Sequence, residues 1–233
     1  MSGFFITGTD TGIGKTFAAC ALIHALQQRG IVVAPMKPIA AGTIDVNGVP
    51  MNEDVALAME MTEHRFSLRT VNPYGFREAI APHLAAAHET VEVDLSVIRS
   101  AYRELTRRAQ VVLVEGAGGF LVPLSDNESM ALIPAALQLP IVLVVGMRLG
   151  CINHALLTVE AIRSRGLTLA AWIANTPGDI MNACAENLST LQRLIGAPLI
   201  GEIPRVRAAS TLLAARIAAA HLHSELLIAV GTR

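Results

Sequence analysis

Short runs of apolar, often β-branched residues recur along the chain and alternate with longer segments of helical periodicity. Several of these runs are apolar at every position, as is typical of strands covered on both faces of a parallel sheet. The runs predict strands at Phe4–Thr7, Ile31–Ala34, Val111–Val114, Ile141–Val145, Leu169–Ala174 and Leu199–Ile203. The segments between them predict helices at 15–28, 53–64, 94–109, 129–138, 154–165 and 183–195.

This alternation of strands and helices predicts an α/β fold with a mainly parallel sheet flanked by helices. Gly30 and Gly166 follow predicted helices and are typical helix stops. The stretch 41–52 is predicted to be a loop, and residues 65–93 are predicted to be irregular. Because no repeat, low-complexity segment or linker divides the chain, we expect one domain over residues 1–233.

Composition and charge narrow the classes of partner. The chain has 233 residues, of which 52% are hydrophobic, and a net charge of −1. A chain of that length can form a well-buried core. Its high apolar fraction is typical of large buried sheets and of a subunit interface. No basic patch stands out, so we do not expect nucleic acid as a partner. The apolar stretch 208–230 is interrupted by Arg216, His221, His223 and Glu225, and we expect buried helix and connections there, not a membrane span.

Cysteine usage and the N-terminal residues bear on the compartment. The three cysteines, Cys20, Cys151 and Cys184, are scattered without a CxxC pair, which argues against a disulfide framework and a zinc site. The N-terminus lacks the basic and long apolar regions of a signal peptide. We therefore expect a cytoplasmic protein. His221 and His223 form an HxH pair in a region that we expect to be helical, so we assign them no metal.

The clearest chemical motif is GTDTGIGKT, residues 8–16, between the first predicted strand and the first predicted helix. Glycine-rich loops in this position turn successive N–H groups toward phosphate oxygens. Lys15 would neutralise the β- and γ-phosphates, and the Thr16 hydroxyl would hold Mg²⁺. Five residues instead of the usual four separate Gly8 from the Gly-Lys pair. The strand–loop–helix context nevertheless favours a phosphate site over a structural turn.

A second lysine and two acids lie near other predicted strand or helix ends. Lys37, between two prolines, is either a surface charge or a positioned group that stabilises developing negative charge. Asp54 lies at a helix start, where stabilisation of the helix is an alternative explanation for an acid. Glu115 ends an apolar strand and precedes a Gly-Ala-Gly-Gly turn. Because Mg²⁺ takes few carboxylates beside phosphate oxygens and water, Glu115 next to a phosphate loop is typical of a magnesium ligand.

Two further strand ends leave alternatives open. In VVGMRLGCINHA, residues 144–155, Asn153 resembles a helix N-cap, while a bare helix start would also suit a carboxylate ligand. Cys151 is interpreted as a small packing residue, because the spacing indicates no histidine partner. Asn175, in WIANT, would either hydrogen-bond a base edge or form a turn.

Taken together, the motifs GTDTGIGKT, MKPIAAG, NED, NPYGF, APH, VEGAGG, VGMRLGCINHA, IAN and GEIP closely resemble the dethiobiotin synthetases. The match extends from about residue 3 to about residue 204, and the order and spacing of the motifs make it specific. The resemblance implies a homodimeric P-loop NTPase-like enzyme with a three-layer α/β fold. Such an enzyme converts 7,8-diaminopelargonate, CO₂ and MgATP to dethiobiotin, ADP and phosphate, through a carbamate and a carbamic–phosphoric anhydride.

The resemblance also implies residue roles. The catalytic residues would be Lys37, Lys15 and Thr11. The Mg²⁺ ligands would be Thr16, Asp54 and Glu115. The nucleotide would contact Gly12, Ile13, Gly14, Lys15, Thr16, Asp54, Glu115, Gly116, Ala117, Gly118, Asn175, Thr176, Glu202, Ile203 and Pro204. The diamine would contact Thr11, Lys37, Ala41, Gly118, Gly150, Cys151, Ile152 and Asn153, with the 150–153 segment supplied by the opposite subunit of the homodimer.

Three positions depart from the pattern of the family. Ala41 stands where a serine is common, Gly12 where some members carry Glu, and Asn187 where some carry an aromatic residue. Ala41 and Asn187 bear on individual substrate contacts, and the phosphate, metal and lysine positions are intact. The tail after Arg205 matches no pattern that predicts a role.

Two other classes of protein share features of this sequence. A nucleotide-switched ATPase that positions chromosomes or septa would carry a signature lysine early in its phosphate loop, and Thr9-Asp10-Thr11 contains none. An amidotransferase of the cobyrinic-acid type would need an additional glutaminase domain, for which the chain has no room. Both are weaker predictions than the synthetase.

Overall fold

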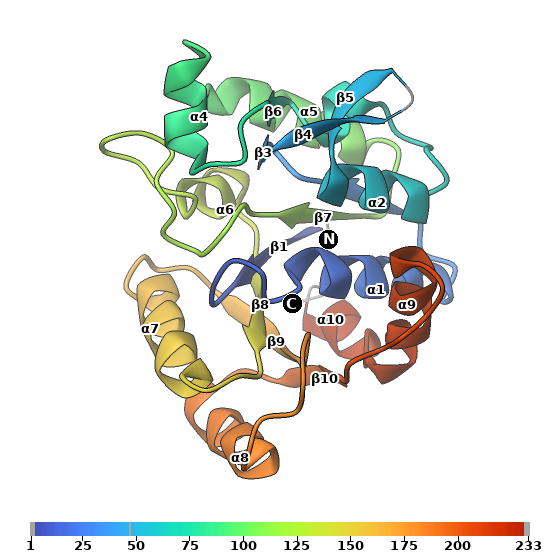
Figure 1. Cartoon of the computed structure of the whole chain (residues 1–233), viewed down its shortest axis with the longest axis vertical. Coiled ribbons are helices and arrows are strands. Elements are labelled where there is room, and N and C mark those ends of the chain that lie inside the picture. Colours follow the sequence, from blue (N-terminus) through green and yellow to red (C-terminus); the bar gives the residue numbers. More distant parts are fainter. Residues whose placement is uncertain (1–2, 47, 231–233) are drawn as a thin grey trace.

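The computed structural model describes residues 3–46 and 48–230. A six-stranded sheet runs through its centre (Figure 1). The strand order is β10–β9–β8–β1–β7–β2, and every neighbouring pair is parallel. The strands are β1 (Gly3–Gly8), β2 (Val33–Met36), β7 (Val111–Glu115), β8 (Ile141–Gly146), β9 (Leu169–Asn175) and β10 (Leu199–Ile203). The predicted parallel α/β sheet is thus confirmed.

Helices cover both faces of the sheet and complete three layers (Figure 1). They are α1 (Lys15–Gln27), α2 (Glu53–Met61), α3 (Leu68–Val71), α4 (Pro82–His88), α5 (Leu95–Thr106), α6 (Leu132–Leu137), α7 (Cys151–Arg163), α8 (Cys184–Ile195), α9 (Thr211–Ala218) and α10 (Glu225–Val230), with a 3₁₀ turn at Ala219–His221. Successive side chains of a strand point to opposite faces. Phe4 and Ile6 accordingly share a core with α1 and α9, while Phe5 packs with α5 and α6.

The central strand β1 fixes where the connecting loops meet. All six of its residues are buried between β7 and β8. Its register places Ile6 opposite Glu115 and Gly8 opposite Val144. Because the three strands are parallel, the loops that follow them leave from one edge of the sheet, where ligands of such folds gather.

Two segments have more structure than the sequence indicated. The predicted loop at 41–52 instead forms an antiparallel hairpin of β4 (Thr43–Val46) and β5 (Val49–Asn52), with Gly48 in the left-handed region at φ 81°. The hairpin is short and half-exposed, so it has no strong apolar alternation. Residues 65–93 contain α3, α4 and β6 (Tyr74–Phe76), which pairs in parallel with β3 (Ile39–Ala41).

Several element ends also differ from the predictions. Strand β2 begins at Val33 instead of Ile31, and α6 spans only Leu132–Leu137 within the predicted 129–138. Helix α2 ends at Met61, because Glu63 and His64 adopt left-handed backbone with φ of 55° and 53°. Hydrophobic periodicity does not reveal where the backbone changes conformation in this way.

The C-terminal region packs against α1, as predicted for buried helix and connections. Ala215 and Ala218 of α9 are fully buried in the core that α1 shares. His221 ends the 3₁₀ turn and His223 lies beyond it, so the predicted helix does not include the whole HxH pair. Within residues 3–46 and 48–230, no helix is both long and apolar enough to span a membrane.

Candidate functional site

The loop between β1 and α1 has the backbone geometry of an anion cradle. Gly12 and Gly14 lie in the left-handed region, at φ 71° and 82°, which glycine adopts without steric cost. A Cβ atom on Gly14 would lie 2.3 Å from the amide nitrogen of Asn175, so no larger residue fits there. Within the described part of the chain, the backbone N–H groups of residues 12–16 have no protein acceptor. N–H groups arranged in this way at a helix start bind phosphate.

Lys15 lies along this loop. Its side chain is buried, and its Nζ donates a hydrogen bond of 2.7 Å to the carbonyl oxygen of Asp10. Burial lowers the pKa of Lys15, and the nearby Glu115 carboxylate opposes only part of that effect. The lysine is therefore held at the phosphate loop by the backbone of the loop itself.

A buried lysine and two carboxylates meet beside the phosphate loop. Lys37 Nζ lies 2.7 Å from Asp54 Oδ2 and 2.7 Å from Glu115 Oε1. Lys37 and Glu115 are only 6% and 5% exposed. The Thr16 hydroxyl donates a 2.7 Å hydrogen bond to the same Glu115 oxygen. Four side chains from α1, α2, β7 and the segment after β2 thus converge on one point.

The charges of this cluster stabilise one another. Burial by itself would lower the pKa of Lys37, but Glu115 and Asp54 outweigh it and raise the pKa above its ordinary value. Burial would likewise raise the pKa of Asp54, but the Lys37 ammonium outweighs it and lowers the pKa. Both groups are therefore charged at neutral pH.

The structure shows what the Asp54 carboxylate contacts. The N-cap of α2 is Asn52, whose side-chain oxygen accepts from the Asp54 N–H at 3.0 Å. The Asp54 carboxylate instead faces Lys37. Asp54 lies in the first turn of α2, where its charge also suits the helix, and Lys37 is buried and not a surface charge.

Asn72 is a supporting residue that the sequence analysis did not identify. Its amide nitrogen donates to the carbonyl oxygens of Lys37, at 2.7 Å, and Tyr74, at 3.0 Å. The Lys37 N–H in turn donates to Val71 at 2.8 Å. The backbone of Lys37 is thus fixed from both sides. The asparagine before a proline in NPYGF is the only signal in the sequence that points to this role.

The donor set at this point suits Mg²⁺. Thr16, Asp54 and Glu115 offer one hydroxyl and two carboxylates, and Mg²⁺ usually fills its remaining positions with phosphate oxygens and water. Across residues 3–46 and 48–230, no three His, Cys, Asp or Glu side chains gather into a metal site of their own. The residues therefore fit a metal that arrives with a phosphate ligand.

The glycine-rich turn after β7 lies against the phosphate loop. The Gly116 N–H donates to Ile6 at 3.0 Å, and a Cβ atom on Gly116 would lie 2.9 Å from the Phe5 ring. Gly118, which follows Ala117 in the same turn, has φ 67°. A Cβ atom on Gly118 would lie 3.5 Å from the Thr11 hydroxyl. Glycine is therefore favoured at both positions, because a Cβ atom would crowd Phe5 at one and Val122, at 2.8 Å, at the other.

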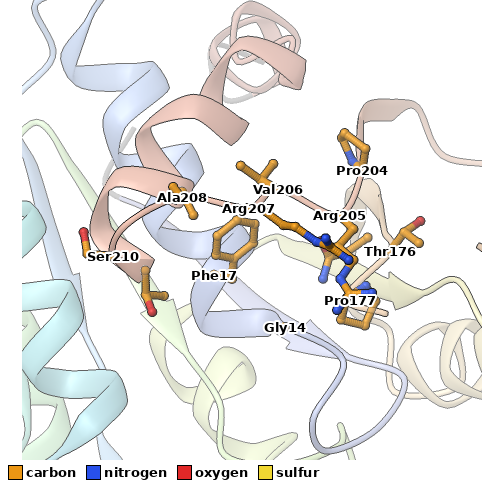
Figure 2. Close-up of a pocket in the computed structure, with 13 residues that line it drawn as sticks. Gly14, Phe17, Thr176, Pro177, Pro204, Arg205, Val206, Arg207, Ala208 and Ser210 are labelled. Carbon is orange, nitrogen blue, oxygen red and sulfur yellow. The ribbon is translucent and has the colours of Figure 1, made fainter. Parts of the chain in front are cut away.

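A pocket of about 370 Å³ adjoins the phosphate loop (Figure 2). Its size is that of a small-molecule site. The lining residues are Gly14, Phe17, Asn175, Thr176, Pro177, Pro204, Arg205, Val206, Arg207, Ala208, Ser210, Thr211 and Ala214. In Figure 2, Phe17 of α1 lies beside Val206, with Pro177 and Thr176 across the pocket. The tail after Arg205, for which the sequence predicted no role, therefore forms much of this wall.

The end of β9 connects the pocket to the phosphate loop. Asn175 is 1% exposed, and its amide nitrogen donates to the Ile13 carbonyl at 2.7 Å. Its role therefore goes beyond forming a turn. Thr176 and Pro204 line the pocket, whereas Glu202 and Ile203 do not. Ile203 is buried and accepts from the Thr176 N–H at 2.9 Å.

The start of α7 corrects one prediction. The helix begins at Cys151, and its N-cap is Gly150 at φ 94° with no side-chain cap, so the prediction of Asn153 as N-cap is wrong. The glycine turns the chain earlier, and the Cys151 N–H bonds to Arg148 at 2.9 Å. Burial raises the pKa of the Cys151 thiol, in agreement with a packing residue. The Ile152 N–H faces the Cys151 sulfur, and among the described residues the Asn153 N–H has no backbone acceptor.

Two positions that depart from the family pattern form hydrogen bonds with nearby residues. Ala41 ends β3, and its carbonyl accepts from the Asn52 side chain at 3.0 Å. Asn187 lies on α8 and bonds to the Ala183 carbonyl at 2.8 Å, at the start of its own helix. Neither contact belongs to the cluster around Lys37.

Fold comparison defines the class of protein. The structure is similar to the MinD cell division protein of Aquifex aeolicus, with a TM-score of 0.57, 14% identity and coverage of 99% of this chain and 98% of that one. It is also similar to a ParA family ATPase from Chlorobium tepidum, with a TM-score of 0.52, 14% identity and coverage of 98% and 97%. At such identities the likeness shows the fold alone. With its phosphate loop, the chain is a P-loop NTPase-like α/β protein.

Sequence comparison defines the family. A family model described as an AAA domain matches residues 2–211. The ATP-dependent dethiobiotin synthetase of Aromatoleum aromaticum is 52% identical over 88% of this chain and 92% of its own length. The corresponding enzyme of Nitrosospira multiformis is 48% identical over 87% and 88%. The chain belongs to the ATP-dependent dethiobiotin synthetases of biotin biosynthesis, which are carbon–nitrogen ligases.

The charge balance around Lys37 generates a stability prediction. Lys37→Met leaves Glu115 buried without its cation, which typically costs about 3–5 kcal/mol. The double variant Lys37→Met/Glu115→Gln removes both charges, and we expect it to be more stable than Lys37→Met alone. The measurement is the free energy of unfolding in urea, followed by far-UV circular dichroism. Equal or greater destabilisation of the double variant would show that the two side chains do not compensate each other.

Proposed function

We propose that the chain catalyses the ring closure of 7,8-diaminopelargonate with CO₂, at the expense of MgATP, and releases dethiobiotin, ADP and phosphate. The observation that carries this proposal is the buried Lys37, held at 2.7 Å from each of two carboxylates beside a phosphate loop. Membership of the synthetase family supplies the substrate class.

The proposed reaction needs three bond-forming steps. One amine of the diamine attacks CO₂ and loses a proton, which gives a carbamate. A carbamate oxygen then takes the γ-phosphoryl group of ATP, and ADP leaves. The second amine attacks the carbonyl carbon of this mixed anhydride, loses a proton and expels phosphate as the ring closes. No step requires a protein nucleophile.

The residues of the chain orient these groups and stabilise negative charge. The free N–H groups of residues 12–16 would bind the triphosphate, with Lys15 against its β- and γ-phosphates. Thr16, Asp54 and Glu115 would hold Mg²⁺, which when bound neutralises charge on the phosphates. Lys37 would stabilise the carbamate and the phosphoryl group in transfer.

The pocket in Figure 2 would bind the adenosine part of ATP. One N–H of the Asn175 amide donates to Ile13, so the side-chain oxygen and the second N–H would be available to the base edge. Phe17 and Pro177 supply apolar walls for the base.

We further propose that the protein acts as a homodimer and that the start of α7 serves the partner's site. The start of α7 has no side-chain cap, and its Asn153 N–H has no backbone acceptor, which suits a ligand with a carboxylate such as the diamine. Leu149, directly before this helix start, is 94% exposed, and Leu157 on α7 is 58% exposed. Apolar side chains exposed together around such a site favour a subunit contact.

The test of the reaction is phosphate release by the purified protein with MgATP and bicarbonate. We expect phosphate to form only when diaminopelargonate is added, together with a product whose mass is that of dethiobiotin. In the same assay, Lys37→Ala should lose turnover by roughly 10²–10³-fold while it still binds nucleotide. Robust turnover without the diamine, or stimulation by DNA or lipid vesicles in its place, would favour a nucleotide-switched ATPase.

The dimer proposal predicts that Leu149→Asp gives a monomer. A charge in an apolar subunit contact opposes association, whereas Ile180→Asp, at an apolar side chain that is 76% exposed elsewhere, serves as the matched control. The molar mass measured by light scattering after size exclusion should fall to that of one chain only for Leu149→Asp. A wild-type monomer, or a Leu149→Asp dimer of unchanged affinity, contradicts the proposal.

A further inference from the structure

The phosphate loop contains the carboxylate of Asp10, which is negatively charged like the proposed triphosphate ligand. Asp10 lies between β1 and α1, and three of its oxygens are used. Its carbonyl oxygen accepts from Lys15 Nζ at 2.7 Å, and its Oδ1 accepts from the Thr11 N–H at 2.7 Å. The third, Oδ2, pairs with the guanidinium of Arg148. Asp10 therefore fixes the loop locally while it places a negative charge beside the phosphate site.

Arg148 comes to Asp10 from another loop of the same sheet edge. It lies between β8 and α7, and its backbone forms a tight turn. The Arg148 N–H donates to Gly146 at 2.9 Å, and its carbonyl accepts from Cys151 at 2.9 Å. The backbone of Arg148 is therefore fixed by hydrogen bonds, while its side chain pairs with Asp10, a residue 138 positions earlier in the sequence.

We propose that Arg148 is a positioning residue that neutralises the charge of Asp10 and so increases the affinity of the phosphate loop for a triphosphate. This inference rests on the nucleotide site of the proposed function. An unpaired carboxylate a few ångströms from a triphosphate repels it, and that repulsion is considerable near a protein surface. Arg148 acts on the nucleotide through Asp10.

The pair also connects two parts of the proposed site. The turn that holds Arg148 sets the start of α7, which we propose for the diamine carboxylate of the partner subunit. Asp10 holds the ammonium of Lys15 through its carbonyl. A displacement of Asp10 would therefore move the acceptor of Lys15 as well. A half-exposed ion pair adds little to stability, so its effect should be on ligand affinity and not on folding.

The experiment is a charge-compensation cycle measured by titration calorimetry with MgATP. Arg148→Ala should weaken binding about tenfold at low ionic strength. Asp10→Asn keeps the acceptor for the Thr11 N–H and removes the charge. In that background, Arg148→Ala should cost less than about twofold, because no carboxylate remains to be neutralised. Arg148→Lys, which keeps the charge, should bind almost as wild type does.

Controls separate this effect from damage to the fold. Arg165→Ala, at an arginine that bonds only within its own neighbourhood, is the matched substitution and should leave affinity unchanged. The loss in Arg148→Ala should shrink as salt increases, since the repulsion is screened. Adenosine, which has no phosphate, should bind all variants alike.

Two results would overturn the inference: unchanged MgATP affinity in Arg148→Ala, or an equal loss in the Asp10→Asn background. The second result would indicate a packing role for the arginine. Failure of the wild-type protein to bind any nucleoside triphosphate is a different outcome, because it removes the proposed function itself along with the inference.

Discussion

The site depends on the ammonium of Lys37, which forms a buried ion pair with Glu115 and a second, half-exposed one with Asp54. Lys37 or Glu115 alone at that depth would be costly, and their distance of 2.7 Å offsets that cost. The hydroxyl of Thr16 joins the same Glu115 oxygen, so the ion pair is tied directly to the first turn of the phosphate-loop helix. The phosphate loop, the proposed metal ligands and the second cation therefore form one structural unit.

The parallel sheet makes that unit possible. Strand β1 lies between β7 and β8, with Ile6 opposite Glu115, so the phosphate loop and the acid leave from one edge. The glycines of the turn after β7 allow it to pack against Phe5 and Val122 beside the phosphate loop, and Asn175 ties the end of β9 to that loop. Each strand end thus contributes a different group to one site. The proposed synthetase chemistry, in which the protein mainly orients reactants and stabilises charge, suits such an arrangement.

Much of the fold and of the candidate site was predictable, because several residues show both their chemistry and their structural context in the local sequence. The fully apolar strands, the GKT motif at a helix start and the acid at the end of β7 all carry local signals. The hairpin at 41–52 does not, because its short strands are half-exposed. Asn153 was wrongly predicted as a cap because Gly150, in left-handed backbone, starts the helix three residues earlier. Asn72, Arg148 and the pocket wall after Arg205 depend on contacts between distant segments, which spacing cannot reveal.

The most direct measurement is a crystal structure of the protein with Mg²⁺ and a non-hydrolysable ATP analogue. We expect the β- and γ-phosphates within hydrogen-bond distance of the N–H groups of residues 12–16, and the metal about 2.1 Å from oxygens of Thr16 and at least one of Asp54 and Glu115. The base should occupy the pocket beside Phe17 and Asn175. A nucleotide bound elsewhere, or a metal without contact to these side chains, would contradict the proposed site.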